Sequence, residues 1–400
     1  MNHEALQVTV HSSMRDICPV QWDRLNRDRS PFLDHAFLRL LEDTQCVGDE
    51  TGWYPAIVTV SQGNDDDREV LGGAPVYVKT HSAGEFVFDW SWADAAHRAG
   101  ISYYPKAVVG VPFTPATGPR LLAKASEDSR RIKALLVQGI LEFSRSSGLS
   151  SVHFNFLTDE DRDVLEELGL PIRIGVQYHW KNGGNGPDRF GCFDDFLAGF
   201  RSKRRANIRR ERKRLEQRGV QTIVKVGDEL CDADMERMFR YYRATVQQYF
   251  YGRQYLNEAF FLEARRRIPS RLHLVFAAQD GDIFGGACNF LSPQRLFGRY
   301  WGCEKEVEFA HFEVCIYRPV RWCIDHELEA FEPGAGGEHK YERGFCPTPT
   351  YSAHILFDSR LQSAVDAFVR DEAGAVTEHI ARLVQESPAA RLLAVPPQKK

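Results

Sequence analysis

The sequence predicts a mixed α/β fold made of two domains in tandem. Segments with strand and helix periodicity alternate along its 400 residues. Residues 71–74 read LGGA and residues 284–287 read FGGA, and each motif opens a predicted hairpin. A glycine precedes a histidine by ten residues in both halves, at Gly169 and His179 and again at Gly344 and His354. The repeated motifs and the repeated order of elements indicate a duplication.

The first half predicts a strand, two helices and three strands, followed by an irregular stretch and then a helix–strand–helix–strand series. Four prolines in residues 103–120 predict largely irregular or edge structure there. Apolar residues at helical spacing over 127–146, ended by Gly148, predict the longest helix. The predicted strands are 6–10, 54–60, 72–80, 85–92, 151–156 and 172–180; the other helices lie within 22–41 and after Asp159.

The second half repeats this pattern after a linker-like segment, KNGGNGPDRFG, at 181–191. We therefore predict domains at 1–190 and 191–360, then a C-terminal helix and a tail over 361–400 that is frayed after about Ala389. The predicted helices begin at Phe193 and cover 232–249, 257–268 and 311–326; the predicted strands are 220–226, 273–278, 285–292, 295–302, 327–331 and 349–357.

The composition is that of an ordinary globular protein, with 43% hydrophobic and 26% charged residues, which excludes global disorder. No apolar run approaches the roughly 18 residues of a membrane span, and the first residues lack the pattern of a secretion signal. The nine cysteines are scattered and form no CxxC pair, so a disulfide frame or a zinc site is disfavoured. We expect a cytoplasmic protein without a metal site or a membrane span.

Basic charge is concentrated in residues 201–218, which read RSKRRANIRRERKRLEQR. Ten Lys/Arg stand there against two Glu, a net +8, although the whole chain carries −4. Phosphate-rich partners favour such a block, whereas a merely solvated helix usually interleaves acids at i+4. The sequence leaves both interpretations open. If the block binds phosphates, we expect Lys203, Arg204, Arg205 and Arg209 to contact them, with RNA rather than DNA as the partner.

The order of elements in each half is the one used by the GNAT acyltransferase fold, in which a mixed sheet splays at its centre and leaves a ligand cleft. The chain also resembles the bacterial FemAB-like "peptidoglycan biosynthesis/recognition" proteins, a branch of the Fem-type transferases. The matching stretches span most of residues 20–357: GEFVFDWSWA (84–93), YYPK (103–106), PFTPATGPR (112–120), HFNF (153–156), QYHW (177–180), FDDFLAGFRSKRRANIRRER (193–212), GRYWGC (298–303), HFE (311–313), GEHKYERGF (337–345) and SAH (352–354).

The resemblance implies a tandem GNAT fold and acyl or aminoacyl transfer, with aminoacyl-tRNA as donor and a cell-wall precursor as acceptor. In Fem-type enzymes a lysine shortly before a Gly-aromatic pair contacts the tRNA-linked substrate. Lys340 before Gly344 and Phe345 matches that pattern with a longer gap. Neither half carries the Q/R-x-x-G-x-G/A turn that holds the pyrophosphate of acetyl-CoA, so ordinary acetyl-CoA use is disfavoured.

The sharpest cluster of ionisable residues is Glu338, His339 and Lys340, after a Gly-rich turn at a predicted strand end. Aminolysis of an ester needs a base for the amine and a cation near the carbonyl, so Glu338 or His339 is the candidate base and Lys340 the cation. His311 and Glu313 begin the preceding helix and are further catalytic candidates. A solvated turn and a helix cap are the plain alternatives.

Substrate contacts are predicted on other segments of both halves. Arg299, Tyr300 and Trp301 end a predicted strand in the second half, which we expect to meet the catalytic candidates at one opening. In the first half, Tyr104 and Lys106 in the proline-rich stretch are candidates for acceptor binding, with a rigid edge loop as the alternative.

Three functions are compatible with these features. The first is an aminoacyltransferase that moves an aminoacyl group from tRNA to an amine or hydroxyl acceptor. The second is a CoA-dependent N-acyltransferase with an atypical phosphate site, and the third is a recognition module without catalysis. For the first two, aminoacyl-tRNA or acyl-CoA is a donor substrate, and no resident cofactor is expected.

Overall fold

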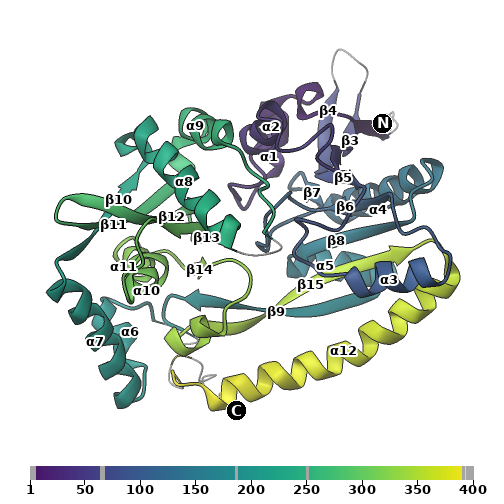
Figure 1. The fold of residues 1–400 in the computed structure, drawn as a ribbon. Helices are drawn as coiled ribbons and strands as arrows, with labels where there is room; N and C mark the ends of the chain where they lie inside the picture. Colours follow the sequence, from purple (N-terminus) through teal and green to yellow (C-terminus); the bar gives the residue numbers. More distant parts are fainter. Residues whose placement is uncertain (1–5, 64–67, 185–187, 249–251, 390–391, 393–400) are drawn as a thin grey trace. The chain divides into compact units, whose positions relative to one another are not determined.

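The computed structural model describes residues 6–63, 68–184, 188–248, 252–389 and 392, and it has the predicted mixed α/β architecture (Figure 1). The helices are α1 Pro19–Leu25, α2 His35–Asp43, α3 Trp90–Arg98, α4 Ser129–Ser146, α5 Asp159–Glu167, α6 Phe193–Ala198, α7 Ser202–Gln217, α8 Asp232–Gln248, α9 Glu258–Arg267, α10 Ala310–Phe312, α11 Arg318–Asp325 and α12 Ser359–Glu386. A π-helical turn, Glu313–Tyr317, joins α10 to α11, and Glu338–Arg343 forms a 3-10 segment.

The strands are β1 Gln7–His11, β2 Trp53–Pro55, β3 Ile57–Gln62, β4 Glu69–Ala74, β5 Val76–Lys79, β6 Lys106–Val109, β7 Leu122–Ala123, β8 Ser151–Leu157, β9 Ile172–Lys181, β10 Val220–Val226, β11 Leu272–Gln279, β12 Asp282–Leu291, β13 Arg295–Cys303, β14 Ala330–Glu332 and β15 Cys346–Leu356. Part of the predicted linker (185–187) and most of the predicted frayed tail (390–391 and 393–400) lie outside the described residues.

Two compact units divide the chain, and neither is one continuous stretch. The first comprises residues 1–175 and 350–377, and the second residues 176–349 and 378–400. The predicted boundaries were at 190 and 360. The difference comes from two strands: the end of β9 pairs with β14 in the second unit, whereas most of β15 pairs with β8 in the first.

The first unit contains two sheets. One has the order β15-β8-β6-β5-β2 and the other the order β1-β3-β4-β7. The amphipathic helix α4 presents one apolar face, Ile132, Leu136, Val137 and Ile140, to the core of this unit. The helix therefore forms where the apolar spacing of 127–146 predicted it.

One prediction in the first unit is wrong. Residues 85–92 are not a strand, because the helix α3 begins at Trp90 and buries Trp92 and Ala96, one helical turn apart. Residues 85–92 alone do not show the helical spacing, because Ala96, the partner of Trp92 on the buried face, lies beyond them. The stretch 103–120 is largely irregular, as predicted; its one strand, β6, is not an edge strand, since it lies between β5 and β8 with all four residues buried. Its flanking prolines lie outside the paired residues.

The second unit has a sheet in the order β10-β11-β12-β13-β14-β9. β13 runs parallel to β14, but only residues 295–297 of β13 pair with 330–332 of β14. Beyond Phe297, β13 continues to pair with β12 to Cys303, while the chain after β14 turns away at Pro333. The sheet therefore opens on one side of β13 from Gly298 onwards, at the position expected for a ligand cleft.

Candidate functional site

A pocket of about 370 Å³ occupies the opening between β13 and the chain after β14. It brings together three segments of the second unit that are far apart in the sequence. Six of the predicted site residues line it: Arg299, Tyr300, Trp301, His311, His339 and Lys340. The wall also includes Asn289 and Cys315, for which no sequence pattern predicted a role in the site. Of the described residues that line the pocket, none is an Asp or Glu, so a negatively charged group is favoured there.

Lys340 holds the Gly-rich turn that forms one wall of this pocket. Its ammonium donates to the carbonyl oxygens of Pro333 (3.3 Å), Gly334 (2.8 Å) and Ala335 (3.3 Å). Burial lowers the pKa of Lys340 to about 8. The side chain is therefore mainly protonated at neutral pH, and it supplies both a loop anchor and a positive charge.

Two imidazoles face one another in the pocket. The ring centroids of His311 and His339 lie 5.6 Å apart, and that of Trp301 lies 5.3 Å from His311. Burial, with help from nearby cations, lowers the pKa of both histidines, that of His311 to about 4. Both rings are therefore neutral at pH 7, and each has a nitrogen that accepts a proton or a hydrogen bond.

Side chains in and beside the π-helical turn lie on two sides, one facing the pocket and the other facing α7. His311 just before it, and Cys315 and Ile316 within it, line the pocket. Glu313 instead forms a two-pronged ion pair with Arg212 of α7, at 2.9 and 3.0 Å. The predicted meeting of His311 with the 338–340 segment occurs, but Glu313 and Glu338 are not among the pocket-lining residues. π-helical turns often occur at functional sites.

The basic block forms α7, and other elements supply the acids that its own sequence lacks. Arg204 pairs with Glu342, at 2.9 Å, and Arg209 pairs with Asp194, at 2.8 Å. Further along the helix, Glu308 accepts from Arg218. The interpretation of the block as a helix without compensating acids is therefore wrong for several of its arginines, including Arg204 and Arg209, two of the predicted phosphate contacts.

Other cations of α7 remain without an acidic partner. Within the described part of the chain, no acid lies within ion-pair distance of Lys203, Arg205, Arg210 or Lys213. Lys203, Arg210 and Lys213 are exposed, whereas Arg205 is half-buried. At 100° per residue, the three exposed cations fall within about 80° of one another around the helix, so they form a stripe along its outer face.

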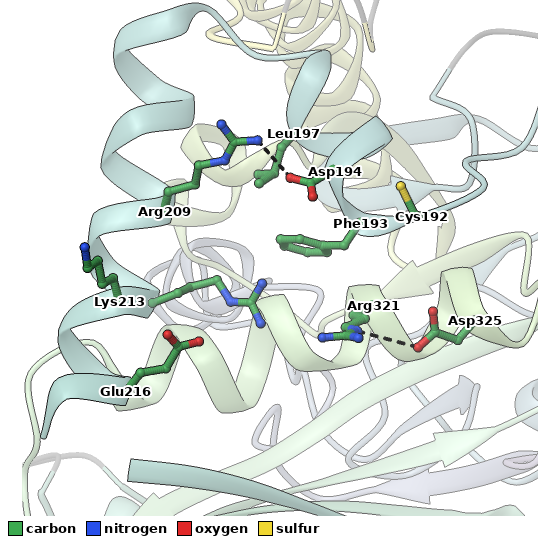
Figure 2. A pocket seen from close by; sticks show the side chains of 10 residues that line it. Cys192, Phe193, Asp194, Leu197, Arg209, Lys213, Glu216, Arg321 and Asp325 are labelled. Carbon is green, nitrogen blue, oxygen red and sulfur yellow. Dashed lines mark hydrogen bonds and ion pairs between the residues drawn. The ribbon is translucent and has the colours of Figure 1, made fainter. Parts of the chain in front are cut away.

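A second pocket, of about 450 Å³, lies among α6, α7 and α11 (Figure 2). Figure 2 shows Arg209 directed at Asp194 on one wall and Arg321 directed at Asp325 on another. Phe193 lies between these two pairs (Figure 2), and the guanidinium carbon of Arg212 lies 4.7 Å from the centroid of its ring. Arg209 and Arg321 thus face acids that line this pocket, which distinguishes it from the pocket around His339.

In the first unit, Lys106 lies at the centre of a buried cluster. Its ammonium donates to Ser82 (3.0 Å), to Glu85 (2.9 Å) and to Asp89. The Lys106 side chain has no exposed surface, so it does not present its charge to an acceptor as predicted. Tyr104 is half-buried, and its hydroxyl lies 2.7 Å from Ser82.

The buried cluster holds two carboxylates against one ammonium. Burial raises the pKa of Glu85 to about 7. Burial acts the same way on Asp89, but Lys106 and then His153 outweigh it and lower the pKa of Asp89 to about 2. The His153 and His354 Nδ1 atoms lie 2.7 Å apart, and burial lowers the pKa of both rings. The charge of the cluster therefore changes both when the pH rises through about 7, where Glu85 ionises, and when it falls to about 3, where His153 is protonated.

No group of three or more His, Cys, Asp or Glu residues with a metal-binding arrangement occurs within the described ranges. Among the helices that the structure describes, none is long and apolar enough to cross a membrane.

Comparison with known proteins identifies the family. The model of the FemAB-like family, described as peptidoglycan biosynthesis/recognition, matches residues 13–391. This chain belongs to the FemAB-like family. The resemblance that the sequence motifs indicated is thereby confirmed. No curated protein sequence matches this chain.

Solved structures with similar folds cover nearly the whole chain of this FemAB-like protein. The crystal structure of FemX is similar with a TM-score of 0.52 at 11% identity, over 90% of this chain and 100% of FemX. The C-terminal domain (DUF2156) of a putative lysylphosphatidylglycerol synthetase from Agrobacterium fabrum gives a TM-score of 0.50 at 11% identity, over 88% of this chain and 95% of that domain. The predicted α/β fold class is confirmed, and the fold is shared with FemX.

The buried cluster of the first unit predicts a pH-dependent stability. Because the pKa of Glu85 is raised, its contribution is fully present below about pH 4.5 and is lost as pH rises through about 7. The pKa of His153 is lowered to about 3, so its contribution is present above 6.5 and is lost as pH falls. We expect Glu85→Gln to remove the loss of stability at alkaline pH, as measured by the free energy of urea unfolding from pH 5 to 8.5.

Glu69→Gln is the control for this experiment, since the Glu69 side chain is 53% exposed in an ion pair with Lys124. It should leave the pH dependence of the unfolding free energy unchanged. An alkaline loss of stability that persists in Glu85→Gln would contradict the assignment to Glu85.

The Gly-rich turn gives a second prediction, which compares two neighbouring glycines. Gly336 and Gly337 have φ values of 70° and 88°, so alanine at either is strained by about 1–2 kcal/mol. A Cβ at Gly337 would also lie 2.7 Å from His339 Cε1, whereas a Cβ at Gly336 meets no atom within 4 Å. Both variants should lose similar stability in thermal unfolding, but only Gly337→Ala should shift the NMR signals of the His339 ring. Equal shifts in both variants would show that the contact does not hold the ring.

Proposed function

We propose that this protein is an acyltransferase that moves an aminoacyl group from an aminoacyl-tRNA to an amine or hydroxyl acceptor, with the chemistry in the second unit. The observation that carries the proposal is the pocket in which Arg299, His311, His339 and Lys340 converge where the sheet opens. Membership in a family described by peptidoglycan biosynthesis/recognition, and a fold similar to that of FemX, support a transferase that acts on a cell-wall precursor.

The pocket supplies what aminolysis of an ester requires. The acceptor nitrogen bonds to the ester carbonyl carbon, and its proton passes to His339, whose lowered pKa keeps the ring neutral and ready to accept. Negative charge that develops on the carbonyl oxygen is stabilised by the cations Lys340 and Arg299. When the carbon–oxygen ester bond breaks, His339 returns the proton to the departing ribose oxygen. No net proton or electron is gained or lost by the protein.

The outer face of α7 suits the polyanionic part of the donor. Lys203, Arg210 and Lys213 form the exposed stripe without acidic partners, and Arg205 lies half-buried on the same helix. RNA phosphates contacted by such a stripe release counterions, so affinity falls with salt in proportion to the number of contacts. This stripe replaces Arg204 and Arg209, which are engaged with Glu342 and Asp194, as the main predicted contact surface.

Salt dependence tests the donor. For charged tRNA, changing Lys203, Arg210 and Lys213 together to Ala should lower the slope of log Kd against log salt by about 2–3, at about 0.7–0.9 per lost contact. The matched control changes Lys124, Arg130 and Arg131, three exposed cations of the first unit, and should keep the wild-type slope. If wild-type protein binds acyl-CoA but not charged tRNA in the same assay, the CoA-dependent alternative is correct.

The pH profile tests the chemistry. Activity should rise as His339 loses its proton below pH 6.5 and fall as Lys340 loses its proton at about pH 8. His339→Ala should lower kcat by roughly 10²–10⁴-fold and abolish the acidic limb. Lys340→Met should lower kcat and abolish the alkaline limb, as measured by aminoacyl transfer from charged tRNA. A wild-type profile without either limb would contradict these roles.

A further inference from the structure

Glu211 is an exception within the basic helix. It is one of only two acids among the ten Lys/Arg of residues 201–218, and it is buried on the inner face of α7. Its Oε2 accepts a hydrogen bond of 2.6 Å from the Tyr317 hydroxyl. Burying a carboxylate is costly unless it is paired, so Glu211 needs a cation beside it.

That partner is Arg343, which is also buried and belongs to the 338–343 segment. One guanidinium nitrogen lies 3.3 and 3.4 Å from the two Glu211 oxygens, and another donates to the His339 carbonyl oxygen at 3.1 Å. The guanidinium carbon lies 3.3 Å from the centroid of the Phe312 ring. Arg343 therefore contacts the backbone of one pocket histidine and the residue next to the other.

Other residues of α7 contact the same two segments. Arg204 donates to the Glu342 carbonyl oxygen at 2.7 Å, and Arg212 holds Glu313. The Arg204 contact lies at the surface, where such contacts contribute little, whereas the Arg212–Glu313 pair is partly buried, with side chains 22% and 11% exposed. In the Glu211–Arg343 pair both side chains are buried, 11% and 6% exposed, and Arg343 is the member that also contacts the backbone of His339.

We propose that Glu211 is a positioning residue, which acts through Arg343 to hold the His339 ring against His311 in the pocket. This inference rests on the proposed function for its significance in catalysis, because it concerns the same pocket. Its consequence is that the helix whose outer face binds the donor also sets the geometry of the proton-accepting groups through its inner face. The outer face of α7 thus contacts the donor, and its inner face contacts the segment that carries His339.

A measurement of ring proximity tests this inference without any substrate. In full-length protein labelled at histidine, ring protons of His311 and His339 should give a nuclear Overhauser cross-peak, since their centroids lie 5.6 Å apart. Glu211→Gln preserves the shape of the side chain and an acceptor for Tyr317, but it removes the charge that holds Arg343. We expect the cross-peak to weaken by about threefold or more relative to a fixed internal distance.

Glu216→Gln is the matched control. Glu216 is the other acid of the basic block, and it is exposed on α7. Its variant should keep the wild-type cross-peak. Arg343→Lys is the second test variant, which keeps the positive charge but loses the forked donors, and it should weaken the cross-peak as Glu211→Gln does. If one of the two variants folds poorly, the other still tests the inference.

The outcomes separate this inference from the proposed function. A folded Glu211→Gln or Arg343→Lys protein with an unchanged cross-peak overturns the positioning role. A weakened cross-peak in Glu211→Gln and Arg343→Lys, but not in Glu216→Gln, supports it. Binding of charged tRNA, measured separately, should be retained in Glu211→Gln, because the exposed stripe is intact. Absence of tRNA binding by the wild-type protein would overturn the proposed donor and leave the cross-peak result standing.

Discussion

Packing a highly basic helix against a domain requires that the cations on its inner side be neutralised. In α7 this is done by acids from other elements, with Glu313 on Arg212 and Glu342 on Arg204. In the opposite sense, Glu211 of the helix pairs with Arg343 of the 338–343 segment. An unpaired charge at the buried Glu211–Arg343 position would cost several kcal/mol, whereas the Arg204–Glu342 pair is more exposed and contributes less, so the buried pairs fix how α7 meets its neighbours. The candidate pocket depends on this constraint, because the acids and Arg343 belong to the segments that form its walls.

The pairing also explains why α7 has two different faces. Cations that meet acids contribute less to the electrostatic field presented to solvent. The exposed cations of α7 without acidic partners, Lys203, Arg210 and Lys213, form a stripe, and Arg205 is half-buried. Charge counting alone assigns all ten Lys/Arg of the block to the solvent. The structure reduces the exposed unpaired charge and places it along one direction of the helix, which suits a phosphate backbone better than a diffuse patch.

Local patterns predicted most of the fold and part of the site. The order of elements, the helix at α4 and the convergence of residues 299–301, 311 and 339–340 follow from periodicity and from where ligands lie in an opened sheet. The acids that pair with α7 lie tens to more than a hundred residues away, so no local pattern connects them. Lys106 illustrates the same limit: a lysine in a proline-rich stretch reads as exposed, yet β6 places it in the core with Glu85 and Asp89.

The course of β15 has a consequence for synthesis of the protein. β8 lies between β6 and β15, and the pair His153 and His354 is separated by 201 residues. At about 5–20 residues per second, the ribosome needs roughly 10–40 s to supply that partner. During this time one edge of β8 lacks its strand, and an open edge is a template for wrong pairing. The first unit therefore completes its fold only after nearly all of the second unit has emerged, which makes its nascent form a candidate client for chaperones.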